Sequence, residues 1–186
     1  TAVLGSNYRM SQITAALLLN QFKRLDEQNR VRMSNAVYLS DALDEMAGFR
    51  SVPRHEDITV DSVYQFLFRY KSGEFEDLPR ETFAEAMNAE GVPVGLGYPR
   101  PLQEYQLFTD IPASMPGGHP FTSGGYKGSV DYSTLETSVT DRLCKLEGLT
   151  LPSNVFLGPR SDIDDVIAAF EKVRKNVCEL AAVAAV

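Results

Sequence analysis

The residues best placed to do chemistry lie at the start of the chain, where Gly5 and the run Asn7-Tyr8-Arg9 directly precede an amphipathic helix. The first turn of a helix offers unpaired backbone N–H groups, and side chains just before it can address the same anion. The Asn7 side-chain amide is a neutral group that can donate hydrogen bonds to a phosphate dianion without forming an ion pair with it. A cap or turn before the helix is the simpler alternative for Asn7, and an ion pair or a surface position is the alternative for Arg9. The residue types therefore mark a candidate anion site and leave its use open.

A second candidate lies in a loop-rich stretch over residues 95–133, which five prolines and seven glycines interrupt. So long an irregular connection in a compact domain is either functional or partly disordered. Its first part, Gly95–Leu102, carries Tyr98, whose phenol can hydrogen-bond a hydroxyl-bearing ligand or can pack on the neighbouring prolines. Tyr64 opens the apolar run Tyr64–Tyr70. A tyrosine within a strand usually belongs to the core, and a ligand contact is the alternative.

The remaining reactive side chains favour neither a nucleophilic nor a metal centre. His55 and His119 lie in polar or Gly/Pro-rich segments without a nucleophile motif or metal-ligand spacing, so we expect both to be solvated. Cys144 and Cys178 are too few for a disulfide framework, and we expect two buried or half-buried thiols.

Length and charge narrow the class of protein. The chain has 186 residues and 44% hydrophobic content, which suits one domain or slightly more. A net charge of −7 argues against nucleic-acid binding, because neutralising phosphates requires clustered Lys and Arg. No signal peptide leads the chain and no apolar run reaches membrane-spanning length, so we expect a cytoplasmic protein without a membrane partner.

The hydrophobic pattern predicts an α+β fold, with a small, mostly antiparallel sheet and helices packed on one side. Gly48 and Gly91 are expected to end helices, and Ser161 to cap the last one. The expected elements are a helix over 10–46, strands over 49–52 and 62–70, a helix over 78–90, a short edge strand over 92–94, the loop-rich stretch, a helix over 135–147, a strand over 149–151 and a helix over 161–177.

Several segments, in order, resemble one enzyme family. The opening Gly5-x-Asn7-Tyr8-Arg9-Met10-Ser11 with Ala15-Ala16 resembles a motif of the DegT-type sugar aminotransferases, which are fold-type I pyridoxal-phosphate enzymes. The strand Tyr64–Tyr70, the segment Phe83–Pro99 and the stretch from Leu151 to Asn176 are similar to the branch that transfers an amino group from glutamine to a keto-inositol. In that family the opening motif follows the segment that carries the cofactor lysine. The resemblance therefore implies a C-terminal portion.

The resemblance also implies roles for the candidate residues. Asn7 and Arg9 would contact the phosphate of a partner subunit's pyridoxal 5'-phosphate, and Tyr98 and Tyr64 would contact the substrate. Many family members have His where this chain has Gly97, so a contact made by that imidazole is missing. The implied protein is a homodimer that takes glutamine or glutamate as donor and a keto-sugar or keto-cyclitol as acceptor. No catalytic residue is assigned to this chain, since its lysines lack the family's Schiff-base context.

The resemblance further divides the chain into a motif loop with a long interdomain or dimer-contact helix over 1–47, a small α/β domain over 48–180 and a frayed tail over 181–186. On this view the isolated segment is inactive. The apolar half of the first helix would form an exposed patch that favours self-association. The alternative is a non-catalytic dimerisation or ligand-binding module built on the same fold.

Overall fold

A one-sided antiparallel sheet organises the computed structural model of the chain, which describes residues 8–109, 116–128, 131–132 and 134–184. Among these residues the strands β1 (Phe49–Ser51), β2 (Gln65–Tyr70) and β3 (Gly148–Pro152) pair in the order β1-β2-β3. Side chains alternate along β2, so that Phe66, Phe68 and Tyr70 are buried while Leu67 is exposed. One face of the sheet therefore carries the core, and the other, which we call the open face, carries Leu67.

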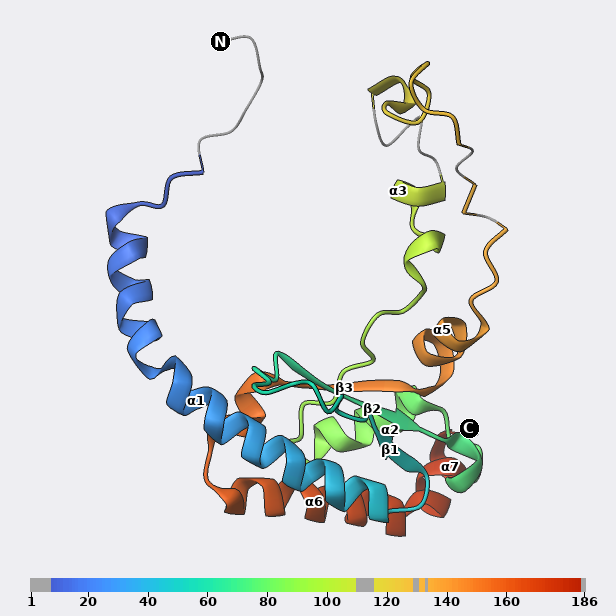
Figure 1. Ribbon diagram of the computed structural model, residues 1–186. Coiled ribbons are helices and arrows are strands. Elements are labelled where there is room, and N and C mark those ends of the chain that lie inside the picture. The colour runs from blue at the N-terminus through green and yellow to red at the C-terminus, as the bar shows by residue number, and fades with distance from the viewer. Residues whose placement is uncertain (1–7, 110–115, 129–130, 133, 185–186) are drawn as a thin grey trace.

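The core forms where helices cover the aromatic face of the sheet. These helices are the second half of α1 (Gln12–Glu45), α2 (Arg80–Ala89) and α6 (Arg160–Lys175), and Figure 1 shows α1 and α6 running beneath the strands. The Phe83 ring stacks on the Tyr70 ring at 4.9 Å between centroids. The Tyr70 hydroxyl donates to the carbonyl of Leu78 at 2.8 Å, and burial raises the pKa of Tyr70, so the phenol remains a donor. The predicted α+β fold with helices on one side of the sheet is confirmed.

Helix α1 divides into a packed half and a projecting half. Asn35, Ala36, Leu39 and Leu43 are buried against the domain. The first half runs away from the sheet in Figure 1 and carries exposed apolar side chains, among them Ile13 at 77% and Phe22 at 74% exposure. The predicted exposed patch is present: the apolar stripe consists of Ile13, Leu17, Leu18, Phe22 and Leu25.

A long excursion separates α2 from β3. It leaves through the turn η2 (Leu102–Glu104) and α3 (Gln106–Thr109), contains η3 (Pro116–Gly118), and returns through α5 (Ser138–Arg142) and the π-helical turn η4 (Leu143–Glu147). We call residues 105–136 the arm. Figure 1 shows it rising on the same side of the sheet as the first half of α1.

The predicted helix over 135–147 is shorter and changes type, for a reason that local sequence does not show. The buried Arg80 donates from Nη1 to the carbonyl oxygens of Leu143 and Gly148, at 3.4 and 3.1 Å. A Cβ on Gly148 would stand 2.5 Å from the Leu143 carbonyl oxygen, so only glycine fits at the end of this wide turn.

Two further element boundaries differ from the prediction. The strand expected over 62–70 begins at Gln65, because Val63 has a positive φ of 47° and donates its N–H to the Asp61 carboxylate at 2.9 Å. Ser161 does not cap α6: Pro159 occupies the N-cap, and its carbonyl accepts the N–H of Asp162 at 3.1 Å.

The end of the chain is helical as far as the structure describes it. Helix α7 (Val177–Ala184) follows α6 and continues through most of the segment expected to fray. Among the described residues, no helix is long and apolar enough to cross a membrane.

Gly91 ends α2 as predicted, with a φ of +88°, and its N–H donates to the Asn88 carbonyl. The prediction that Gly48 caps α1 is wrong: α1 ends at Glu45 with Met46 as an extended C-cap, and Gly48, with a φ of +93°, lies in the turn that leads into β1. At Gly48 a Cβ would overlap the Phe75 ring, whereas nothing lies within 4 Å of a Cβ on Gly91. We expect Gly91→Ala to lower the free energy of unfolding by about 1–2 kcal/mol through the backbone alone, and Gly48→Ala to lower it by at least about 3 kcal/mol. Urea unfolding of both variants measures the difference, and equal losses would show that the Phe75 contact is unimportant.

The apolar stripe of α1 predicts self-association that rises with protein concentration, because contiguous exposed apolar surface associates in water. Sedimentation velocity should show the effect in the parent chain. The double variant Leu17→Glu/Phe22→Glu should remain monomeric. The control Gln12→Glu/Ala16→Glu adds the same charge to the opposite, exposed face of the same helix and should still associate. A parent chain that is monomeric throughout, or two double variants that behave alike, would count against the stripe.

Candidate functional site

The start of α1 has the donor chemistry of an anion site. Ser11 is the N-cap and its hydroxyl accepts the N–H of Thr14 at 3.1 Å. The first turn of the helix contains no acidic residue, and Arg9 is exposed just before it. A positive helix end, an arginine and no competing carboxylate suit a phosphate. Asn7 lies outside the described residues.

Tyr98 is held at the surface by a segment that is anchored to β3. Gly95 and Thr150 exchange two backbone hydrogen bonds of 2.8 Å. Gly97 then takes a φ of +67°, where a side chain such as His would be strained, and a Cβ would stand 3.4 Å from the Thr150 methyl group. Tyr98 follows at 70% exposure, so the prolines of its loop leave most of the phenol free to meet a ligand.

Tyr64 is 81% exposed and lies just outside β2, so the core interpretation of this residue is wrong. The next residue, Gln65, pairs with Pro152 at the end of β3. Tyr64 thus lies just before the start of β2, and Tyr98 follows the segment that pairs with β3. Arg9 precedes the end of α1 that projects away from the sheet (Figure 1). Among the residues that the structure describes, Arg9, Tyr64 and Tyr98 line neither of its two best-formed pockets.

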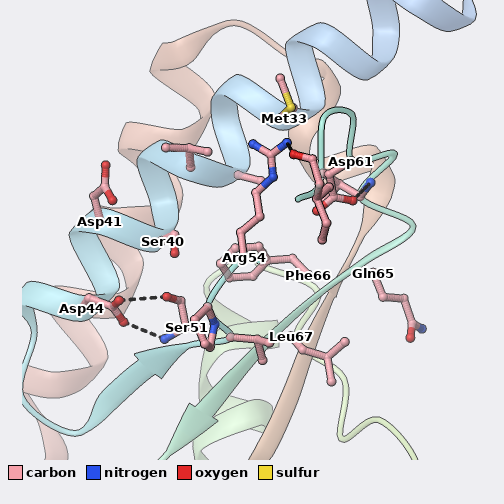
Figure 2. Close-up of a pocket in the computed structure, with 16 residues that line it drawn as sticks. Met33, Ser40, Asp41, Asp44, Ser51, Arg54, Asp61, Gln65, Phe66 and Leu67 are labelled. Atoms are coloured by element: carbon pink, nitrogen blue, oxygen red, sulfur yellow. Dashed lines mark hydrogen bonds between the residues drawn. The ribbon is translucent and has the colours of Figure 1, made fainter. Parts of the chain in front are cut away.

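A hollow that sequence reasoning missed lies between α1 and the connector that joins β1 to β2 (Figure 2). Its volume is about 450 Å³, within the range of small-molecule sites. Arg54 extends into it between Met33 and Asp61, and donates from Nη2 to the carbonyl of Ile58. Of the sequence candidates that the structure describes, Arg9, Tyr64 and Tyr98 do not line it. Arg54 and Asp61 occur in a polar connector without a motif, so no sequence signal could have identified the hollow.

On one wall of this hollow, the Asp44 carboxylate lies beside β1, an outer strand of the sheet. Asp44 accepts the N–H of Ser51 at 2.7 Å and its hydroxyl at 2.9 Å (Figure 2). Both oxygens of Asp44 are thereby engaged, and Asp61 already accepts the Val63 N–H. These carboxylates act as structural acceptors.

The histidines and cysteines behave mostly as expected. His55 is exposed, with Nδ1 3.3 Å from an Asp57 carboxylate oxygen, and His119 is exposed. Cys144 is a half-buried free thiol. Cys178 is exposed, so the expectation that both thiols are buried or half-buried is wrong for this residue.

Comparison with known proteins gives these features a context. L-glutamine:2-deoxy-scyllo-inosose aminotransferase of Streptomyces fradiae is 32% identical over 181 residues, which are 96% of this chain and 41% of that protein. L-glutamine:scyllo-inosose aminotransferase of Streptomyces griseus is 31% identical over 180 residues, again 96% and 41%. The chain therefore spans about two fifths of the length of these relatives.

Solved structures share the fold. The crystal structure of 3-amino-5-hydroxybenzoic acid synthase matches with a TM-score of 0.67 at 21% identity, over 91% of this chain and 41% of that one. Residues 1–131 match the family model described as the DegT/DnrJ/EryC1/StrS aminotransferase family. The chain, with its Asn-Tyr-Arg motif, long first helix and one-sided sheet, belongs to this aminotransferase family.

Proposed function

We propose that this chain is the C-terminal part of a pyridoxal-phosphate-dependent aminotransferase that moves an amino group from glutamine or glutamate to a keto-sugar or keto-cyclitol. Its role is to complete the site of a partner subunit in a homodimer. The observation that carries the proposal is that, in a family member, the start of α1 projects away from the sheet (Figure 1), so that Arg9, just before α1, and Tyr64, just before β2, belong to different parts of the chain. Residues that do not converge within one chain can converge between two.

The residues before α1 fit the cofactor's phosphate. Arg9 and the acid-free first turn of α1 supply positive charge and N–H donors, and Asn7 adds an uncharged amide. When bound, pyridoxal phosphate supplies the electron sink for the reaction. In this proposal Asn7 and Arg9 only hold and orient its phosphate.

Three of the six lysines of this chain are paired with carboxylates and do not suit the covalent attachment of the cofactor. An attacking amine must be neutral, which requires a lowered lysine pKa. Hydrogen bonds to Asp141 and Glu104 raise the pKa of Lys145, while Lys172 and Lys175 pair with Glu90 and Glu171. In this proposal the attaching lysine belongs to a segment encoded upstream of Thr1, as the family resemblance implies.

Substrate contacts come from exposed phenols. Tyr98 and Tyr64 can each donate to and accept from a hydroxyl of a keto-sugar or keto-cyclitol. The open face of the sheet lies between the projecting half of α1 and the arm in Figure 1. Closing that space with the missing segment would exclude water from the reacting carbonyl.

The chain by itself is expected not to transaminate, because it lacks the proton-transferring lysine. The assay incubates purified chain with pyridoxal phosphate, glutamine and 2-deoxy-scyllo-inosose, and follows amine formation. Sequencing the DNA upstream of Thr1 should show an in-frame segment that carries a lysine. Robust turnover by the chain alone would refute the proposed division of labour. A stop codon directly upstream would favour the non-catalytic dimerisation or ligand-binding module.

In the polypeptide that includes the upstream segment, Asn7→Ala should weaken cofactor affinity about tenfold, through the loss of a hydrogen bond to a charged phosphate. Fluorescence titration with pyridoxal phosphate measures the change. The control is Asn20→Ala on the same helix, whose amide bonds only the Ala16 carbonyl in the described structure. Equal affinities for parent and Asn7→Ala would remove Asn7 from the phosphate site.

A further inference from the structure

A closed ring of polar contacts joins the two ends of the arm. Gln103 donates from Nε2 to the Thr137 hydroxyl, which donates to the Asp141 carboxylate at 3.1 Å. Lys145 donates to Asp141 and to Glu104, each at 2.7 Å. The peptide bond between Gln103 and Glu104 closes the ring, so residues about 40 positions apart are held together where the chain leaves the domain and where it returns.

The ionised form of this ring is favoured. Hydrogen bonding to Lys145 is the largest influence on Asp141 and lowers the pKa of its carboxyl group. The two carboxylates raise the pKa of Lys145. Each pair is partly exposed and weak alone, but a lysine shared by two carboxylates forms a network.

The return side of the ring is fixed to the sheet domain. Glu147 accepts the Nε–H of Arg69 on β2 at 2.7 Å and forms an ion pair with Arg142, whose Nε lies 3.0 Å from its carboxylate. The buried Arg80 on α2 holds the carbonyls of Leu143 and Gly148. Lys145 lies in the turn between these anchors, so its position is set by the core.

The described parts of the arm beyond the ring pack mainly on one another. Phe108 meets Tyr132 edge-on at 5.8 Å, and Phe121 meets Tyr126 edge-on at 5.3 Å. None of these four rings belongs to the hydrophobic core of the described structure. The orientation of the arm relative to the sheet domain must therefore be set by the residues where the arm leaves the domain and returns to it.

We propose that Lys145 is a positioning residue: it clasps Glu104 of the outgoing segment to Asp141 of the returning segment, and so fixes the arm in one orientation on the sheet domain. This goes beyond the proposed function, because it concerns how the chain holds its arm and is independent of any reaction. The sequence does not indicate this role, because Lys145 and Glu104 are 41 residues apart.

The test is amide hydrogen exchange of the full 186-residue chain. Lys145→Met removes the charge and keeps the aliphatic stem. We expect about fivefold faster exchange at the hydrogen-bonded amides of Tyr105, Thr109 and Asp141. Exchange in α6 should not change. The control Lys172→Met removes a comparable exposed pair, Lys172–Glu90 at 2.6 Å, and should leave exchange at those three amides unchanged.

Two further measurements separate a clasp from a packing effect. In about 1 M sodium chloride, screening should bring the parent chain close to the exchange rates of Lys145→Met. The reversed pair Glu104→Lys/Lys145→Glu should restore slow exchange, since Lys at position 104 can then pair with the acid at position 145 and with Asp141. Unchanged exchange in Lys145→Met, equal acceleration by Lys172→Met, or a difference that persists in high salt would overturn the proposal.

Discussion

The structure depends on the fact that its small sheet has only one apolar face. The alternation of Phe66, Phe68 and Tyr70 along the central strand commits every large aromatic side chain of that strand to the same side. Helices can bury apolar surface only there, so α1, α2 and α6 share that side and the other remains open. The long helix and the arm, which need not cover the core, both extend past the open face (Figure 1).

This asymmetry explains why the candidate functional residues surround the domain. The start of α1 projects beyond the packed half (Figure 1), while the exposed Tyr64 lies just before β2 and the exposed Tyr98 follows the segment that pairs with β3. A single copy provides a frame with contact groups on its rim. The relative from Streptomyces fradiae is more than twice as long as this chain.

Prediction from sequence succeeded where the determining interaction is local. The helix over 10–46 follows from its apolar stripe, and Gly91 follows from the left-handed conformation that a helix end needs. Prediction from sequence failed where contacts with other residues determine the local backbone conformation. The π turn before β3 depends on Arg80, over 60 residues away, and the positive φ at Val63 depends on the Asp61 carboxylate. The hollow beside Arg54 was missed for the same reason, because its walls come from three separate elements.

Tyr64 shows a different limit of prediction from sequence. Its apolar neighbours suggested burial, yet it lies one residue before the strand begins.

The carboxylate of Asp44 has a consequence for how this protein meets other chains. By accepting the Ser51 N–H and hydroxyl, it occupies a donor on β1 that would otherwise face outward from the sheet. An exposed strand edge is a template on which a stray strand can add and start a fibril. With β1 only three residues long and its outer donor already satisfied, that route is blunted. Association of the chain is thereby directed to side-chain surfaces, where shape and chemistry select the partner, and away from backbone pairing, which accepts almost any sequence.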